Sequence, residues 1–363
     1  MKAHKISWWR TTFSNGEAAA ITRAIANEHV SQGPLVAEFE RQLASYLEVP
    51  YIVATTSGST ALLMGMMAAG VGPGDEVIVP NRTWIATAHA PLLLGAKVKL
   101  VDVEPDRPII DAHLIEAAIT ARTKAIVPVH MGGRSADMRA INQIAQRHNL
   151  AVIEDAAQAL GSRNVDGLLG TQSTMGCFSL SVAKIIATGQ GGFIATRDDA
   201  VHRKLVAIRT QGVGDVVNAA WEQPGFNFRF TDILAAIGIE QLKLLDDRIK
   251  AVNAIYQCYA NGLRDNPHVR LIPVDVSAGE VPVYVEARSP VRDELVAWLG
   301  ECGIQCRPFY PGLHHAPYLN ATGGFPNAEP IGEEGLYLPC GPTQPLENVH
   351  AVVSSILDFE PSL

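Results

Sequence analysis

The sequence is poor in cysteine and in basic charge, and it contains no long apolar run. Only five of its 363 residues are cysteine, and 29 Lys and Arg stand against 37 Asp and Glu, a formal net charge of −8. An acidic chain does not suit nucleic acid as a general partner, because phosphate backbones bind basic surfaces. No apolar run reaches the roughly 18 residues of a membrane helix, and residues 1–13 do not read as a signal peptide. We therefore expect a soluble cytoplasmic protein without a nucleic-acid or membrane partner.

The cysteines predict neither a disulfide framework nor a metal centre. Their number is odd, and no two of them have the C-x-x-C spacing. Cys302 and Cys306 are about one helical turn apart, but no second pair of Cys or His completes a zinc site. We expect reduced thiols and no bound metal.

Length and composition predict two domains. A chain of 363 residues, 47% of them hydrophobic and 18% charged, exceeds one typical core. Strand and helix patterns alternate over the first two-thirds, and a long helical pattern over 231–263 then breaks the rhythm. We expect a large domain over residues 1–240, with the N-terminal segment included, and a smaller C-terminal domain over residues 241–363.

The alternation of patterns predicts the fold class. Apolar, mostly β-branched runs occur at 51–55, 76–80, 97–103, 125–129, 151–155, 177–181 and 192–196. Helical patterns at 59–70, 111–121 and 136–148 lie between them, and Ser14 and Glu17 form a capping box before an earlier helix. Such strands indicate a mainly parallel sheet covered on both faces. The prediction is an α/β fold: a three-layer αβα large domain, plus a smaller α+β domain with a strand at 281–287 and a helix at 289–303.

Lys184 and Asp155 are the most informative residues. Asp155 ends the apolar run AVIED, and a flexible Thr-Gly-Gln-Gly-Gly turn at 188–192 follows Lys184. Pyridoxal phosphate requires a lysine that forms a Schiff base and an acidic partner that keeps the pyridine nitrogen protonated. Each residue also has an ordinary explanation, because lysines often lie in solvated turns and aspartates often cap helices. The case for the cofactor depends on the other elements around this pair.

A phosphate-binding element precedes the pair. Gly58, Ser59 and Thr60 stand where a strand gives way to a helix, and the free N–H groups and dipole of a helix start bind phosphate. Hydroxyl residues at this position are also common helix caps. Ser179 lies five residues before Lys184 and is a further candidate for a phosphate-binding hydroxyl.

Two other residues are candidates for contacts with a cofactor ring. Trp84 follows the strand at 76–80, where it either stacks on an aromatic cofactor or packs in the core. Gln158 follows Asp155 by three residues and either reaches the phenolic oxygen of the cofactor or is an ordinary polar loop side chain.

Together these elements resemble the DegT/StrS family of sugar aminotransferases, which have the aspartate aminotransferase fold (fold type I). Nine segments carry the resemblance in order: 31–40, 56–65, 83–90, 101–111, 127–133, 153–162, 179–192, 225–242 and 310–318. No single segment is decisive, but their common order makes chance agreement implausible.

The resemblance implies a role for each candidate. Lys184 would form the Schiff base with pyridoxal phosphate, and Asp155 would pair with the pyridine nitrogen. Trp84 would stack on the ring, and Gln158 would contact the cofactor oxygen. The phosphate cup would consist of Gly58, Ser59, Thr60 and Ser179. Asn227, in the segment GFNFRF, would reach the cofactor phosphate of the neighbouring subunit, which implies a homodimer with shared active sites.

The implied reaction moves an amino group from an amino acid, for which we expect L-glutamate, to a nucleotide-linked keto-deoxysugar in deoxyaminosugar biosynthesis for a polysaccharide or an antibiotic. Pyridoxamine phosphate would carry the amine between the half-reactions. We expect a nucleoside diphosphate 4-keto-6-deoxyhexose, with a 3-keto isomer or a cyclitol ketone as alternatives. A sugar dehydratase of the same fold would have His in place of Lys184. A non-enzymatic cofactor-binding regulator would be favoured by loss of Lys184 or Asp155, and both are present.

Several positions depart from the family pattern near the expected acceptor. Gln190 replaces the usual acidic residue, and Leu180 and Ser181 stand where an aromatic residue is frequent. Leu160 occupies a position where many members have His. The motifs therefore do not predict that this chain makes the family's usual contacts with the sugar.

Arginine and histidine residues are candidates for substrate contacts. Arg229 and Arg307 would hold the donor carboxylate or the acceptor diphosphate through bidentate hydrogen bonds, with surface salt bridges as the alternative. His130, His314 and His315 have either catalytic or structural roles.

Overall fold

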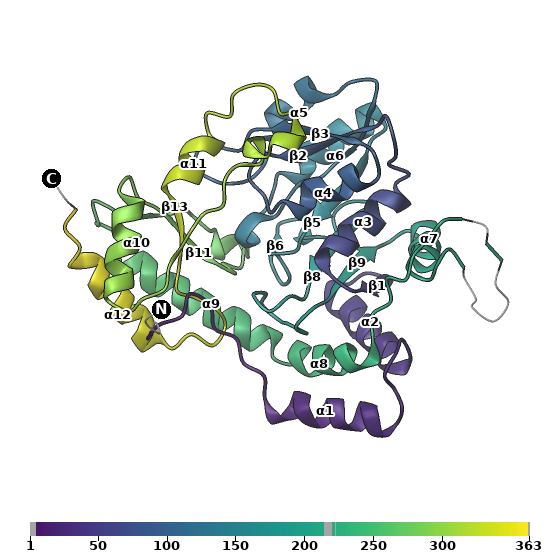
Figure 1. The fold of residues 1–363 in the computed structure, drawn as a ribbon, viewed down its shortest axis with the longest axis horizontal. Helices are drawn as coiled ribbons and strands as arrows, with labels where there is room; N and C mark the ends of the chain where they lie inside the picture. The colour runs from purple at the N-terminus through teal and green to yellow at the C-terminus, as the bar shows by residue number, and fades with distance from the viewer. Residues whose placement is uncertain (1–4, 214–219, 222, 362–363) are drawn as a thin grey trace.

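The computed structural model describes residues 5–213, 220–221 and 223–361. Its largest sheet has seven strands in the order β1-β9-β8-β5-β4-β2-β3 (Figure 1). These strands are β1 (Tyr51–Thr55), β2 (Glu76–Pro80), β3 (Lys97–Val101), β4 (Thr123–Ile126), β5 (Ala151–Asp155), β8 (Met175–Ser179) and β9 (Gly192–Thr196). β9 is antiparallel to both of its neighbours, and the other neighbouring pairs are parallel. The predicted mainly parallel sheet is confirmed, with strand ends shifted by a few residues.

Helices cover both faces of this sheet (Figure 1). One face contacts α3 (Gly58–Ala68), α4 (Ala86–Leu93) and α7 (Asp199–Arg209), and the other contacts α5 (Ala112–Ala118) and α6 (Met138–His148). Successive strand residues point to opposite faces. Val77 and Val79 of β2 therefore join the first core, whereas Ile78 joins the second. This arrangement is the predicted three-layer αβα domain.

The helical pattern after residue 231 forms two helices. α8 (Asp232–Leu242) packs on α1 (Asn15–Ala26) and α2 (Pro34–Leu47), beside the large sheet. α9 (Leu245–Gly262) packs on the last helix, α12 (Leu346–Leu357). The predicted capping box of Ser14 and Glu17 is present at the start of α1. The domain boundary after residue 240 stays a prediction.

A second sheet has four short antiparallel strands in the order β10-β11-β13-β12. They are β10 (Arg270–Leu271), β11 (Val285–Arg288), β13 (Gly335–Leu338) and β12 (Arg307–Pro308). The strand predicted at 281–287 begins later because the chain turns at Val281, whose carbonyl accepts the Val283 N–H at 2.8 Å. The helix predicted at 289–303 is α10 (Arg292–Glu301).

Short elements connect these parts. They are the hairpin of β6 (Arg163–Asn164) and β7 (Gly167–Leu168), the helix α11 (Ala328–Glu334), and four 3₁₀ helices: η1 (Met131–Gly133), η2 (Val276–Ala278), η3 (Leu313–His315) and η4 (Pro317–Leu319). No helix in the described parts of the chain is long and apolar enough to cross a membrane. The cytoplasmic location stays a prediction.

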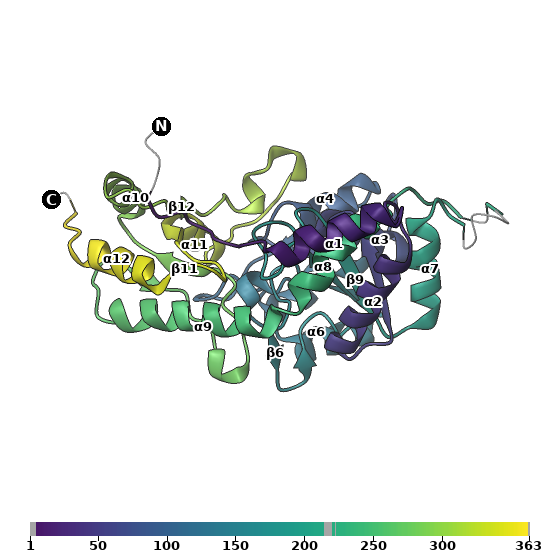
Figure 2. The same ribbon diagram turned by 90° about the horizontal axis from the view of Figure 1, so that it is seen from below.

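The N-terminal segment lies against the C-terminal part of the molecule. Ile6 forms a β-bridge with Ile304, and Trp9 forms one with Cys340. The segment begins beside α10 and α12 and runs from there to α1 (Figures 1 and 2). Residues near the start of the chain are thereby brought next to the second sheet.

Candidate active site

A cavity of about 450 Å³ lies between the carboxyl edge of the large sheet and the second sheet. Eight of the residues singled out in the sequence line it: Gly58, Ser59, Trp84, Asp155, Gln158, Ser179, Lys184 and Arg307. The topology explains this grouping. β1, β5 and β8 run in the same direction, so the segments that follow them meet at one edge.

Asp155 is the last residue of β5 and is 5% exposed. Its Oδ2 atom accepts a hydrogen bond from Thr87 Oγ1 at 2.7 Å, and its Oδ1 atom accepts one from the Ala157 N–H at 3.1 Å. Burial raises the pKa of the Asp155 carboxyl, and these hydrogen bonds and the Lys184 charge act in the opposite direction. The carboxylate is therefore held in one orientation, with a nearby cation favouring its ionised form.

Lys184 lies in the loop that follows β8. Its N–H donates to the Ser181 carbonyl at 3.1 Å, which closes a turn. Removal from water lowers the pKa of the Lys184 amine to about 8, while the charge of Asp155 acts to raise it. An amine with this pKa exchanges its proton near neutral pH, as a nucleophile and general base must.

The start of α3 forms a tight cradle beside the lysine loop. Ser57 caps the helix, and its Oγ accepts the Thr60 N–H at 3.1 Å. A Cβ atom on Gly58 would lie 2.8 Å from the Ser179 Cβ, so only glycine allows the helix and strand to approach this closely. The first N–H groups of a helix have no partner within the helix. Gly58, Ser59 and Ser179 thus surround a site suited to phosphate.

Trp84 and Gln158 also face the cavity. The Trp84 side chain is 56% exposed, and its ring lies edge-on to Tyr310 at 5.4 Å between centroids. Gln158 Oε1 accepts the Gly132 N–H at 2.8 Å, which leaves its amide nitrogen to donate to a ligand. Trp84 is therefore not a core residue, and Gln158 is not a free loop side chain.

Other predicted site residues do not line this cavity. The Thr60 hydroxyl contacts those of Thr56 and Ser57. Asn227 is exposed and pairs with Thr210 in a β-bridge, and Arg229 pairs with Thr55. Their predicted contacts stay predictions.

The three candidate histidines do not line this cavity. His314 and His315 belong to η3, where the His314 Nδ1 lies 2.7 Å from the Asn81 amide nitrogen. His130 is completely buried, with its Nε2 atom 3.0 Å from Glu154 and its Nδ1 atom accepting the Ala136 N–H at 3.2 Å. The backbone N–H of His130 also donates to the backbone carbonyl of Asp155 at 3.0 Å, so His130 supports the strand that carries the aspartate.

The structure also shows where the residues that depart from the family pattern lie. Gln190 and Ser181 line the cavity. Leu160 and Leu180 are buried in the hydrophobic core and do not line it. These two leucines therefore form no part of the cavity wall, and the effect of the departures on the acceptor stays a prediction.

Sequence reasoning missed several side chains of the wall. Among them are Thr87 and four residues from distant segments: Trp8, Tyr284, Tyr310 and Tyr337. Thr87 lies one helical turn after Trp84, which is a weak signal. No local pattern identifies the others, because their positions depend on how the second sheet and the N-terminus pack.

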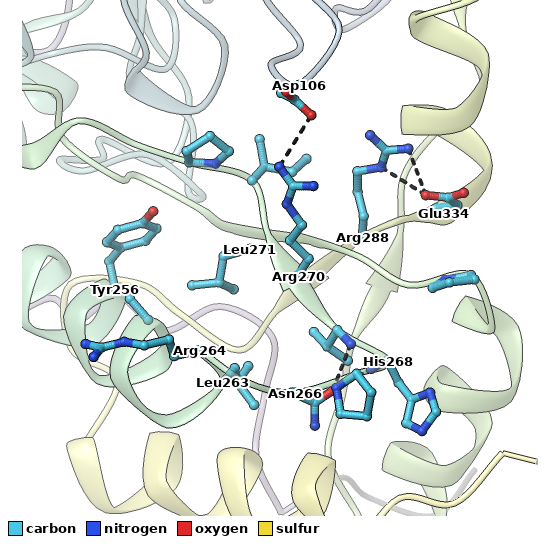
Figure 3. A pocket seen from close by; sticks show the side chains of 16 residues that line it. Asp106, Tyr256, Leu263, Arg264, Asn266, His268, Arg270, Leu271, Arg288 and Glu334 are labelled. Atoms are coloured by element: carbon cyan, nitrogen blue, oxygen red, sulfur yellow. Dashed lines mark hydrogen bonds and ion pairs between the residues drawn. The ribbon is translucent and has the colours of Figure 1, made fainter.

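A second, larger cavity of about 570 Å³ lies outside this site, between the end of α9 and the second sheet (Figure 3). Arg288 forms an ion pair with Glu334 at 2.8 Å, and Arg270 lies 3.5 Å from Asp106. Its lining contains no lysine. The smaller cavity is therefore the candidate active site.

The structure combines a mainly parallel sheet, a buried acid at the end of one strand, and a lysine that enters the cavity after the neighbouring strand. This combination defines a pyridoxal-phosphate-dependent transferase of fold type I. The chain belongs to the DegT/DnrJ/EryC1/StrS aminotransferase family, whose family model matches residues 12–357. It is a pyridoxal-phosphate-dependent sugar aminotransferase. The residues present fit the cofactor, since the Gly58 cradle, Lys184 and Asp155 face one cavity.

Similar proteins cover most of the chain. GDP-perosamine synthase of Caulobacter vibrioides is 39% identical over 317 residues, which are 85% of this chain and 85% of that protein. The spore coat polysaccharide biosynthesis protein SpsC of Bacillus subtilis is 31% identical over 94% of both chains. The crystal structure of DesV of S. venezuelae in complex with a ketimine intermediate has a TM-score of 0.91 and 32% identity, covering 96% of this chain and 95% of that one.

Proposed function

We propose that this aminotransferase moves the amino group of L-glutamate to the C-4 ketone of a nucleotide-linked 4-keto-6-deoxyhexose. The observation that carries the proposal is the common cavity of Lys184, Asp155 and Arg307, which combines a reactive amine, an acid and a cation. The similarity to GDP-perosamine synthase supports a nucleotide-linked sugar as acceptor.

Each cavity residue has a specific task in this proposal. Lys184 tethers pyridoxal phosphate, and Asp155 faces its pyridine nitrogen. The bound cofactor supplies an electron sink for the charge left on the substrate carbon. The Lys184 amine would take the proton from the amino-acid carbon at Nζ and deliver it to the other carbon bonded to the transferred nitrogen, and it would carry a proton the opposite way for the keto-sugar. The hydrogen bonds from Thr87 and Ala157 keep the Asp155 carboxylate oriented during both half-reactions.

The remaining residues hold the cofactor in place. Trp84 covers its ring, and the Gln158 amide donates to its phenolic oxygen. The phosphate is bound at the start of α3 by Gly58 and Ser59 and by the Ser179 hydroxyl, where N–H groups and the helix dipole favour a dianion. The polar cradle and the aromatic cover lie on one cavity, which supports this orientation.

Arg307 binds the anionic part of the substrates. Its guanidinium lies 4.1 Å from the centroid of the Trp8 ring, and among the described residues no carboxylate is recorded as its partner. A guanidinium without a carboxylate in a cavity is suited to the donor carboxylate or the acceptor diphosphate. Both substrates use the site in turn, so one cation serves both half-reactions.

The active enzyme is a homodimer with shared sites. Asn227 lies on the surface, and its neighbour Phe226 is 66% exposed and packs its ring against Phe228 at 5.3 Å between centroids, which leaves apolar surface beside Asn227 for a partner subunit. In the dimer, Asn227 reaches the phosphate cradle of the neighbouring subunit. Residues 214–219, which precede this segment, lie outside the described part of the chain.

A substrate panel tests the proposed function. The enzyme loaded with pyridoxamine phosphate is mixed with GDP-, UDP- and dTDP-linked 4-keto-6-deoxyhexoses, a 3-keto isomer and inosose, and the visible absorbance of the lysine-bound cofactor is followed. We expect this absorbance to return with a 4-keto nucleotide sugar, and the amino sugar to be found by mass spectrometry. Return with the 3-keto isomer or inosose alone would contradict the proposed acceptor, and no return with any ketone would contradict the proposed activity.

A further inference from the structure

The turn that carries Lys184 is held by distant parts of the chain. Three consecutive carbonyls precede the lysine, and each accepts a hydrogen bond. The Ser181 carbonyl accepts the N–H of Lys184 itself. The Val182 carbonyl accepts Trp9 Nε1–H at 3.1 Å, and the Ala183 carbonyl accepts the Tyr284 hydroxyl at 2.6 Å. The last two donors come from the N-terminal segment and from the residue that precedes β11, so tertiary structure determines the position of the turn.

Tyr284 also covers the amine itself. The Lys184 Nζ atom lies 5.8 Å from the centroid of the Tyr284 ring, and the Tyr284 side chain is buried. Trp8 stacks on Tyr284 at 6.2 Å, and Trp9 packs against it at 5.3 Å between ring centroids. The ring is therefore held on its outer side by two tryptophans and faces the lysine.

We propose that Tyr284 is a positioning residue for Lys184: its hydroxyl fixes the turn, and its ring keeps water from the amine. Trp9 holds the same turn from the N-terminal segment. This inference rests on the proposed function, in which Lys184 tethers the cofactor. It adds that the second sheet and the N-terminus, rather than the large sheet alone, set the location and the basicity of the reactive amine.

The hydrogen bonds from Tyr284 and Trp9 differ in how much their loss should cost. The bond from Tyr284 is short and partly buried, and its donor side chain is buried, so water replaces it less readily. The bond from Trp9 is exposed, and water replaces it after substitution. Tyr284 is therefore the stronger of the two contacts.

The charges around Lys184 do not change when the Tyr284 hydroxyl is removed. The titratable side chains that line the cavity with the lysine are Asp155, Tyr284, Arg307, Tyr310 and Tyr337. Tyr284→Phe leaves the aromatic ring and all charged groups in place. A change in the Lys184 pKa in this variant would therefore report access of water to the amine.

The test uses the cofactor-free full-length enzyme, so it does not depend on turnover. Wild type, Tyr284→Phe and Trp9→Phe are acylated briefly at a series of pH values, and modification of Lys184 is measured by mass spectrometry against the exposed Lys243. In wild type, the pH at which acylation of Lys184 is half-maximal, called the midpoint below, should be about 8. In Tyr284→Phe we expect the midpoint to rise by about one unit and the reactivity at pH 8 to fall about five-fold. Trp9→Phe should shift it less.

Tyr259→Phe is the matched control. Tyr259 is fully buried, and its hydroxyl also donates to a carbonyl, that of Pro339 at 2.9 Å, but it does not line the cavity. This variant should lose stability without moving the Lys184 midpoint. An unshifted midpoint in folded Tyr284→Phe, or an equal shift in Tyr259→Phe, would overturn the positioning role.

A separate measurement distinguishes this inference from the proposed function. Wild-type enzyme loaded with pyridoxal phosphate is reduced with borohydride, and the labelled peptide is identified. A label on another lysine defeats the proposed function and with it this inference. A label on Lys184 together with an unshifted midpoint in Tyr284→Phe defeats the positioning role alone.

Discussion

Replacing Asp155 with Asn should change the reactivity of Lys184 and the rate of transamination in opposite directions. Asn has the same shape: its side-chain oxygen is able to accept the Ala157 N–H bond, now 3.1 Å, and its NH2 group is able to donate to the Thr87 hydroxyl, which lies 2.7 Å from the carboxylate. The substitution therefore removes the charge with little change in packing. In the cofactor-free enzyme that charge acts to raise the Lys184 pKa against the effect of burial. In the loaded enzyme, as proposed above, it would face the pyridine nitrogen.

The expected change in Lys184 reactivity follows from the pKa of its amine. Burial lowers the pKa of Lys184 to about 8 although Asp155 opposes this shift. Without the carboxylate charge the pKa should fall further. A fall of about one unit would raise the neutral fraction at pH 7 from roughly a tenth to about half, which is about a five-fold gain in reactivity. A charge pair at contact distance near a protein surface is worth about 4 kcal/mol, so transamination should fall by about 100- to 1000-fold.

Two assays check this prediction. Acylation of Lys184 at pH 7 in the cofactor-free protein should increase in Asp155→Asn relative to the exposed Lys243, and single-turnover transfer from L-glutamate should decrease. Unchanged or lower acylation would refute the coupling between the two residues. Near-normal transfer would show that the cofactor is held in another orientation.

Three further predictions concern the tether, the anion site and the dimer. Lys184→Ala should abolish transamination while equilibrium dialysis still detects cofactor binding, because the phosphate cradle is separate from the lysine; residual turnover would contradict its role. Arg307→Gln should raise KM by about ten-fold or more with a smaller effect on kcat, since a lost charged hydrogen bond costs about 1.5–3 kcal/mol; steady-state kinetics with an unchanged KM for both substrates would remove Arg307 from the site. Mixing inactive Lys184→Ala protein with an inactive Asn227→Ala variant should restore partial activity after subunit exchange, because some heterodimers contain one intact site; a fully active monomer in sedimentation would exclude shared sites.

Local sequence patterns were sufficient for the large sheet and for much of the cavity. β-branched runs and amphipathic helices alternate as predicted, and because parallel strands end at one edge, Asp155, Ser179 and the glycine start of α3 line one cavity. Lys184 follows directly from the end of β8. The side chains predicted from strand ends reach the cavity because chain direction alone carries them to that edge.

The second sheet was predicted less well, since its strands are short and one turn delays β11 to Val285. His314 and His315 are candidates for substrate contacts; η3 places His314 against Asn81, neither histidine lines the cavity, and their role stays a prediction. Leu160 and Leu180 follow strand ends, and packing places both in the hydrophobic core. These outcomes depend on packing between segments far apart in the sequence, which local patterns do not report.

The sequence by itself determined the class of chemistry, because the lysine, the acid and the phosphate-binding helix start are each linked to a strand end. Only the tertiary structure decided what surrounds the amine. Tyr284 and Trp9 lie 101 and 173 residues from the carbonyls that they bind. Hydrogen bonds over such separations form only after the N-terminus and the second sheet have packed on the large domain. No periodicity or motif in the sequence therefore predicts them.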